Sequence, residues 1–493
     1  MKHEVSNRKI FTATKWSSFA EIAARISSPI VNMVLARLLT PDAFGIVASI
    51  TIITSFADIF TDAGFQKFVI QHEYKDDKEL EIGSNVAFTA NLFLAIFVYT
   101  MVLIFRTPLA VAVGCDGEEV GIAISSLAVF CTAIPSVATA RFRRDLNFKP
   151  LFFIRIVSAL IPLIVTVPLA LLVHSYWALI IGTLLQKIFV AITTILISKW
   201  KPKVCFNFEV FKQMFGFSVW NLLETLSIWF AGQANIFIVG NLLDSYYLGL
   251  YKTAMSTVNS CLGLITGAFT PVFFSTLSRY QNDLKSYTKT FNSFQYILGL
   301  LVIPLGVGIF MYRRFITTIL LGSQWIEATM FLGLWALVST ITIVYSNTAC
   351  EVYRSYGKPK VSLIMQVCYL ILYVPTIYMC AKRGFIILSY MSCFIRLLPV
   401  IADFIVLNCM FKLKFTNIMD NTGYTIFASV LMAVICFFLQ KVSYSLIWNF
   451  ISIFICVLVY FSLILINPKQ RARIMSFNFI SEYTTIVLMK GIK

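Results

Sequence analysis

The chain has 493 residues, of which 59% are apolar and only 13% are charged, and its mean hydropathy is +0.83. A soluble protein of this length needs a polar surface in which about a quarter of the residues are charged. The composition therefore excludes an ATPase with its own nucleotide domain, a cytosolic glycosyltransferase and a DNA-binding protein.

Roughly 290 residues are apolar, and a membrane-spanning helix uses about 20 of them. We therefore predict an all-α polytopic membrane protein with about fourteen transmembrane helices. In chain order, apolar stretches of this length lie at 15–40, 43–69, 82–106, 120–140, 151–173, 176–198, 216–240, 246–276, 290–312, 326–350, 361–381, 384–409, 422–440 and 445–467.

Lys and Arg are distributed unevenly between alternate connections of these spans. The set that includes both termini carries 28 basic residues, and the other set carries 7. Because basic residues collect in cytoplasmic loops, both termini are predicted to be cytoplasmic. The net charge of +17 then reflects membrane topology, and we predict no nucleic-acid partner. No cleavage-site pattern follows the first apolar run, so we expect no removable signal peptide.

The sequence repeats itself at a nearly constant spacing. Leu38 to Gly45 resembles Leu242 to Gly249 at an offset of 204, and two later matches keep the same order along the chain. These matches predict two duplicated lobes with the same orientation in the bilayer. We expect helices 1–6 at 1–206, helices 7–12 at 207–411, two additional helices at 412–467 and a basic cytoplasmic tail at 468–493.

Three segments resemble one known family. They are Ala36-Arg-Leu-Leu-Thr-Pro-Asp-Ala-Phe-Gly45, Phe56-Ala-Asp-Ile-Phe-Thr-Asp-Ala-Gly64 and Leu242-Leu-Asp-Ser-Tyr-Tyr-Leu-Gly-Leu-Tyr251. They are similar to the polysaccharide transporter family, the Wzx-type flippases of the multidrug/oligosaccharidyl-lipid/polysaccharide exporter superfamily. The resemblance covers essentially the whole chain, and it implies two six-helix lobes in a V-shaped arrangement.

The resemblance also implies a function and a set of partners. A flippase of this family turns an undecaprenyl-diphosphate-linked oligosaccharide from the cytoplasmic to the periplasmic leaflet of the bacterial inner membrane. Relatives export O-antigen, capsule or exopolysaccharide repeat units. Expected partners are the lipid-linked glycan, membrane lipids, a proton or sodium ion, and a polysaccharide polymerase with its chain-length regulator.

Polar residues inside the predicted spans fall on single helix faces. Helix 1 carries Glu21 and Arg25 in such a stripe, and helix 2 carries Thr51, Ser55, Asp58 and Asp62 at spacings of 4, 3 and 4. Charged residues in a membrane normally face a bundle interior or an aqueous cavity. Together with Glu224 on helix 7, the carboxylates Glu21, Asp58 and Asp62 are candidates for ion coupling. Two alternatives stay open, because Glu21 and Arg25 could neutralise each other and small polar stripes also mediate helix packing.

A diphosphate-linked glycan carries about two negative charges and needs compensating cations in a low-dielectric environment. The candidates for the central cavity are Arg25 and Lys252, and those for the cytoplasmic mouth are Arg141, Arg143, Arg144 and Arg354. The mouth residues have a competing explanation as topological anchors. Arg396 and Asp403, seven residues apart, could line a groove in the second half or pair with each other.

Other functions leave signatures that this sequence lacks. There is no Walker A motif, so direct use of ATP is unsupported, and no cofactor, metal site or catalytic residue is predicted. A cation or drug antiporter of the same superfamily is the nearest alternative, but it predicts an acidic cavity. A membrane polymerase or acyltransferase would carry a large external loop or an embedded His. A passive scaffold would leave the charged stripes unexplained.

Overall fold

The computed structural model describes residues 27, 29–61, 65–72, 74–145, 147–411, 413, 415–443 and 445–475. These residues form helices joined by short connections, and no β-strand occurs among them. The predicted all-α class is confirmed. The chain divides into two compact units, Met1–Thr253 with Ile377–Phe385 and Ala254–Thr376 with Ile386–Lys493. The lobe boundaries expected from the repeat stay a prediction.

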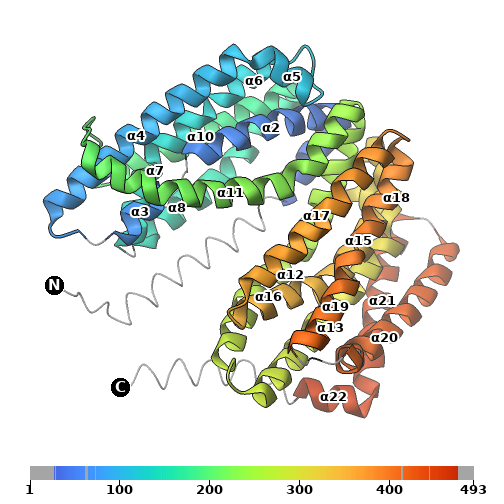
Figure 1. Ribbon diagram of the computed structural model, residues 1–493. Coiled ribbons are helices and arrows are strands. Elements are labelled where there is room, and N and C mark those ends of the chain that lie inside the picture. Colours follow the sequence, from blue (N-terminus) through green and yellow to red (C-terminus); the bar gives the residue numbers. More distant parts are fainter. Residues whose placement is uncertain are drawn as a thin grey trace. The chain divides into compact units, whose positions relative to one another are not determined.

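The first unit contains the helices up to the start of α12 (Figure 1). Its core is formed where α4 and α10 pack on α7 and where α11 packs on α2. The helices are α2 (Pro41–Thr61), α3 (Phe65–Gln71), α4 (Asp77–Ile104), α5 (Arg106–Ala112), α6 (Glu119–Ser126), α7 (Ala128–Arg144), α8 (Phe148–Ile161), the π-helix η1 (Pro162–Thr166), α9 (Val167–Val173), α10 (Trp177–Ile197), α11 (Phe208–Leu242) and α12 (Ser245–Arg279).

The second unit contains most of α12 and the helices that follow it. Here α13 packs on α15 and α20, and α20 packs on α21. The helices are α13 (Leu284–Met311), α14 (Arg313–Ile316), the π-helix η2 (Thr317–Leu321), the 3₁₀-helix η3 (Ser323–Ala328), α15 (Thr329–Ile341), the π-helix η4 (Thr342–Asn347), α16 (Thr348–Ser355), α17 (Pro359–Ala381), α18 (Phe385–Ile395), α19 (Leu398–Phe411), α20 (Phe415–Val442), α21 (Leu446–Ile466) and α22 (Pro468–Met475).

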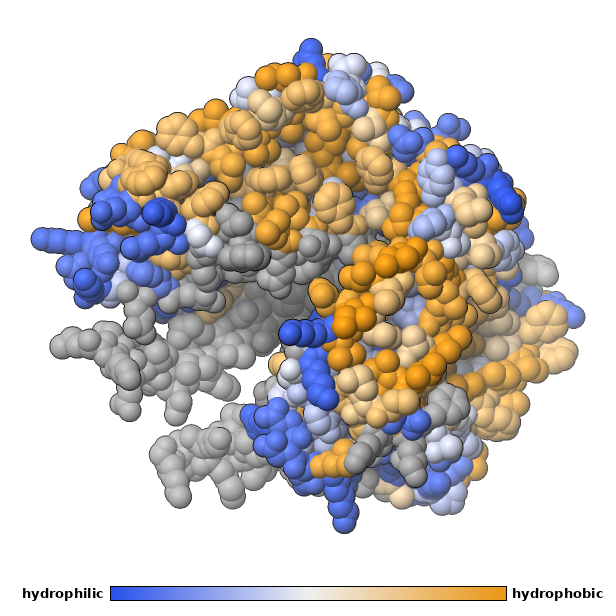
Figure 2. All heavy atoms as spheres, in the orientation of Figure 1, coloured by the Kyte–Doolittle hydropathy of each residue, from blue (hydrophilic) through white to orange (hydrophobic). Residues whose placement is uncertain are grey.

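Twelve helical segments of the described residues are long and apolar enough to cross a membrane. Figure 2 shows apolar side chains over the long sides of these helices and hydrophilic residues gathered near their ends. Two of the predicted spans, 15–40 and 216–240, are not among the twelve. Half of the first lies outside the described residues, and its described part contains the short apolar helix Pro29–Leu38. The second lies within the 35-residue helix α11. The total of about fourteen therefore stays a prediction.

Short polar side chains fix the start of three long helices. Asp76 accepts a hydrogen bond from the backbone of Glu79 at 2.7 Å at the start of α4. Asn207 and Asp283 cap α11 and α13 in the same way. These caps satisfy backbone N–H groups that have no partner within the helix. Hydrogen bonds from Ser286 hold the pKa of Asp283 below its ordinary value.

Glycines at two matching positions of the predicted repeat both have a positive φ. Gly114 has a φ of +71° and Gly322 a φ of +110°, a region that L-residues with a side chain rarely adopt. Each glycine follows a short helix, α5 in the first copy and α14 with η2 in the second. Both members of the predicted repeat therefore place a positive-φ glycine after a short helix.

The starts of α2 and α12 contact each other through another matching pair of glycines. A Cβ atom on Gly45 would lie 1.7 Å from the carbonyl oxygen of Ser245, and one on Gly249 would lie 1.8 Å from that of Pro41. The Ser245 hydroxyl also donates a hydrogen bond to Asp42. Because equivalent positions touch reciprocally, the glycines of the repeated motif are required for this close backbone approach.

We expect Gly45→Ala to destabilise the protein, because the added methyl group would overlap a backbone oxygen and force the two helices apart. Overpacking of this kind costs about 1–3 kcal/mol. Thermal unfolding of the detergent-solubilised protein measures the effect. Gly423→Ala is the matched control, since no heavy atom lies within 4 Å of the added Cβ there. A Gly45→Ala protein as stable as the wild type would contradict the interpretation.

Candidate functional site

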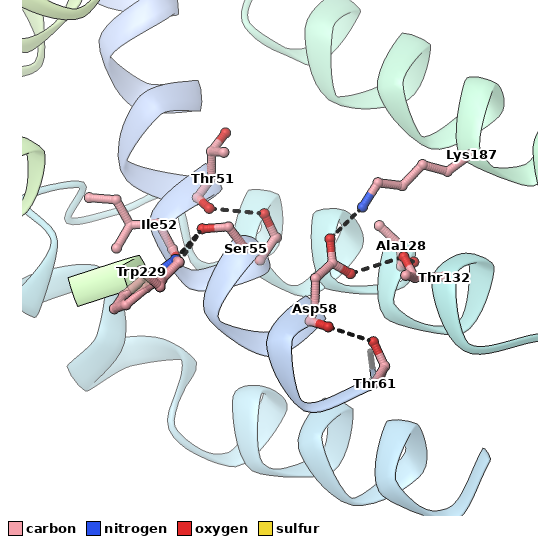
Figure 3. Close-up of polar contacts among 10 residues, drawn as sticks. Thr51, Ile52, Ser55, Asp58, Thr61, Ala128, Thr132, Lys187 and Trp229 are labelled. Atoms are coloured by element: carbon pink, nitrogen blue, oxygen red, sulfur yellow. Dashed lines mark hydrogen bonds and ion pairs between the residues drawn. The ribbon is translucent and has the colours of Figure 1, made fainter. Parts of the chain in front are cut away.

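The carboxylate of Asp58 on α2 forms an ion pair inside the first unit (Figure 3). Its Oδ2 lies 2.7 Å from the Nζ atom of Lys187 on α10, and its Oδ1 accepts a hydrogen bond from Thr132 on α7 at 3.0 Å. The side chains of Asp58 and Lys187 are 28% and 33% exposed. Asp58 thus joins three helices and has its charge compensated within the protein.

The rest of the predicted polar stripe on α2 takes part mainly in helix contacts. Ser55 accepts a hydrogen bond from the indole N–H of Trp229 on α11 at 3.0 Å, and Thr51 bonds to the carbonyl oxygen of Val47 in its own helix. This arrangement corresponds to the packing alternative for small polar residues in membrane helices. Asp62 lies outside the described residues.

Lys252 on α12 is a half-buried cation. Within the part of the chain that the structure describes, it has no hydrogen-bond or ion-pair partner. The other predicted central cation, Arg25, and its neighbour Glu21 lie outside the described residues, and the side chain of Glu224 is likewise not described. Of the two cations predicted to line the central cavity, Lys252 is the one that the structure describes, and no described residue compensates its charge.

The arginines at the end of α7 have distinct surroundings. Arg144 donates hydrogen bonds to the carbonyl oxygens of Val69, Ile70 and His72 at 2.8, 3.2 and 2.7 Å, where α3 ends. Its guanidinium also lies 4.8 Å from the ring centre of Tyr74, and burial raises the pKa of that phenol to about 12. Arg144 therefore has a structural role, because it satisfies carbonyl groups that a helix end leaves without partners.

The other arginines of the predicted cytoplasmic mouth make fewer polar contacts than Arg144. Arg141 lies 5.8 Å from the ring centre of Trp200 and 3.4 Å from the hydroxyl of Ser84. Arg143 is exposed. Arg354 corresponds to Arg144 in the predicted repeat. It pairs with Glu351 of its own helix at 3.1 Å, and its side chain is 56% exposed. Ion pairs this exposed contribute little stability.

Arg396 and Asp403 of the second unit do not pair with each other. The Arg396 guanidinium lies 4.0 Å from the ring centre of Trp335 and donates to the hydroxyl of Ser339 at 3.2 Å. Asp403 is 2% exposed and accepts hydrogen bonds from the hydroxyls of Ser346 and Tyr353. Of the two alternatives for this pair, mutual neutralisation is wrong.

Sequence reasoning missed two basic residues inside the spans. Of the 40 Lys and Arg residues, 35 fall in the connections and tails that set the topology. The other five are Arg25, Arg155, Lys187, Lys252 and Arg396. Subtracting the loop residues from the total would have identified Arg155 and Lys187. Among the described residues, no cluster of three or more His, Cys, Asp or Glu side chains is placed to hold a metal ion.

Comparison with known families gives a match over more than half of the chain. The model of a family described as "Polysaccharide biosynthesis protein" matches residues 34–330. This range includes α2 with Asp58, the end of α7, and Lys252. The match therefore covers Asp58, Arg144 and Lys252, whereas the candidates Glu21 and Arg25 precede it.

Three relatives are similar over most of the chain. An uncharacterized membrane protein in the cps region of Klebsiella pneumoniae is 22% identical over 81% of this chain and 84% of the relative. The succinoglycan biosynthesis transport protein ExoT of Rhizobium meliloti is 24% identical over 66% of this chain and 64% of its own length. The lipopolysaccharide biosynthesis protein WzxC of Escherichia coli is 21% identical over 72% of this chain and 70% of its own length.

Two solved structures share the fold. The lipid II flippase MurJ in an inward closed conformation aligns with a TM-score of 0.73 at 15% identity, over 91% of this chain and 98% of MurJ. An inward-facing multidrug resistance MATE family transporter of the MOP superfamily aligns with a TM-score of 0.57 at 11% identity, over 82% and 94% of the two chains. The protein therefore has the fold of polytopic all-α transporters.

We expect Arg144→Gln to lower the thermal stability of the solubilised protein by about 1–3 kcal/mol, because three carbonyl groups lose a charged donor. Arg143→Gln is the matched control, since it removes the same charge from the same helix end without removing a described contact. Equal effects of the two substitutions on the unfolding midpoint would contradict the structural role of Arg144.

Proposed function

Because this chain belongs to the polysaccharide biosynthesis protein family, we propose that it is a flippase for an undecaprenyl-diphosphate-linked oligosaccharide. It would move the repeat unit of an O-antigen, capsule or exopolysaccharide from the cytoplasmic to the periplasmic leaflet of the bacterial inner membrane by alternating access. The names of ExoT and WzxC as polysaccharide transport and biosynthesis proteins support this proposal. The fold shared with the lipid II flippase MurJ supports it too.

The observation that carries the proposal is the open charge of Lys252. An ammonium group in an apolar span is expensive to keep unless it faces a cavity or meets an opposite charge. No described carboxylate lies within ion-pair distance of Lys252, so an anionic ligand would compensate its charge. A diphosphate has that charge, and Lys binds phosphate as a compact point charge. An antiporter for cationic drugs would instead need an acidic centre.

The basic residues of the predicted cytoplasmic mouth would assist loading. Arg141 is half-buried and the side chain of Arg354 is 56% exposed, and both would attract the lipid-linked diphosphate from the cytoplasmic leaflet. Arg144 has its donors directed at the end of α3, so we assign it to the fold and no longer to the substrate. Arg25 is also proposed for the central site, and this proposal rests only on the sequence pattern.

The ion pair of Asp58 suggests how a gradient would drive the cycle. Asp58 and Lys187 hold α2 against α10, and protonation of Asp58 or binding of a sodium ion beside it would weaken that contact. The packing of the two helices would then depend on the gradient. Glu21, Asp62 and Glu224 stay proposed as further coupling carboxylates on the sequence pattern.

We expect Lys252→Gln to abolish export in the native host, since the amide cannot compensate a diphosphate. In a deletion strain, the lipid-linked repeat unit should accumulate inside the cell and one surface glycan should disappear. Complementation with the wild-type gene should restore the glycan, and complementation with Lys252→Gln should not.

Arg383→Gln is the matched control, because Arg383 is an exposed cation in the connection before α18. An unaltered surface-glycan profile in the deletion strain would contradict the flippase proposal. Full complementation by Lys252→Gln, with the protein present at its normal level, would contradict only the role of Lys252.

We expect Asp58→Asn to remove the response of transport to an imposed gradient, because the amide neither takes up a proton nor attracts Lys187. Proteoliposomes with a proton or sodium gradient would measure the initial transport rate. Asp145→Asn, an exposed carboxylate at the end of α7, controls for the change in charge. An Asp58→Asn protein that still accelerates under either gradient would exclude this residue from coupling.

A further inference from the structure

The transmembrane segment Phe385–Phe411 is broken near its middle. Helix α18 ends at Ile395 and α19 begins at Leu398, so Arg396 lies in the two-residue break. With a rise of about 1.5 Å per residue, Arg396 lies roughly 16 Å from one end of the segment and 22 Å from the other. Broken helices near the bilayer midplane are a recurrent feature of transport sites.

Two side chains of α15 hold the Arg396 guanidinium in place. Its Cζ atom lies 4.0 Å from the ring centre of Trp335, and one of its N–H groups donates to Ser339. Trp335 is only 3% exposed, and its indole N–H donates to the side-chain oxygen of Asn259 at 3.3 Å. The buried indole is thus a fixed platform against one face of the cation, as in a cation–π pair.

No residue that the structure describes neutralises the charge of Arg396. No described carboxylate is within ion-pair distance of its guanidinium, and the oxygens of Asp403 already accept hydrogen bonds from Ser346 and Tyr353. A guanidinium has five N–H donors, and one of them is used on Ser339. A half-buried Arg facing lipid would be costly, and the donors that Ser339 does not use are available to a polar ligand.

We propose that Arg396 is the binding residue for an acidic substituent on the glycan, so that the transported repeat unit carries a carboxylate such as that of a uronic acid. This inference rests on the proposed flippase function and names its substrate class. Trp335 covers a face of the guanidinium and leaves its edge for a planar anion, and a carboxylate fits that edge with two parallel hydrogen bonds.

The test measures binding to the full-length protein in lipid nanodiscs with three probes. The first is undecaprenyl diphosphate, the second is an undecaprenyl-diphosphate-linked glucose disaccharide, and the third is the same lipid with glucuronic acid as its terminal sugar. We expect the wild type to bind the acidic lipid about tenfold more tightly than the neutral one, the scale of a charge-assisted hydrogen-bonded pair.

We expect Arg396→Gln to reduce this ratio to about one and to leave the affinity for undecaprenyl diphosphate unchanged. Arg396→Lys keeps the positive charge but lacks the planar guanidinium, so it should retain part of the preference for the acidic lipid. This variant shows whether the loss in Arg396→Gln comes from the charge or from misfolding. Arg383→Gln, which removes an exposed cation outside the broken segment, should behave as the wild type.

Three results would overturn the inference. Equal affinity of the wild type for the acidic and the neutral lipid would do so while leaving the flippase proposal intact. Loss of undecaprenyl diphosphate binding in Arg396→Gln would assign this arginine to the diphosphate instead. Failure of the wild type to bind any of the three probes would contradict the proposed function itself.

Discussion

The compensation of charge in an apolar environment is the constraint on which this structure depends. Asp58 has Lys187 at 2.7 Å and a hydroxyl donor, and Asp403 has two hydroxyl donors in a nearly fully buried position. Lys252 and Arg396 have no carboxylate partner among the described residues. Since an uncompensated charge in a membrane is costly, the paired groups support the fold, and we propose the two cations without a described carboxylate partner as binding residues for an anionic substrate.

Composition and periodicity were sufficient to predict the fold class, because a chain with so few charged residues has no means of covering a soluble surface. The repeat was also visible in the sequence, and its glycines show why: Gly45 and Gly249 make reciprocal backbone contacts, and Gly114 and Gly322 share a positive φ. A close backbone contact or a positive φ requires glycine itself. An apolar helix position accepts several residue types, so it leaves a weaker trace of the repeat in the sequence.

The division of the polar residues between packing and function could not be predicted from the sequence. Spacing placed Ser55 and Asp58 on one face of a helix, but it could not show that Trp229 and Lys187 from other helices would occupy them. It placed Arg144 with the mouth residues, whereas the carbonyl oxygens at the end of α3 take its donors. Partners from distant helices decide these roles, and helical periodicity carries no information about them.

Transport of a lipid-linked oligosaccharide by the purified protein alone would test the flippase proposal most directly. The full-length chain would be reconstituted in proteoliposomes with a labelled undecaprenyl-diphosphate-linked oligosaccharide in both leaflets, and a membrane-impermeant glycosidase would be added outside. We expect the protected half of the glycan to become accessible in the presence of the protein and to stay protected in protein-free liposomes. Protection of that half in both preparations, with correctly folded protein in the membrane, would contradict the flippase proposal.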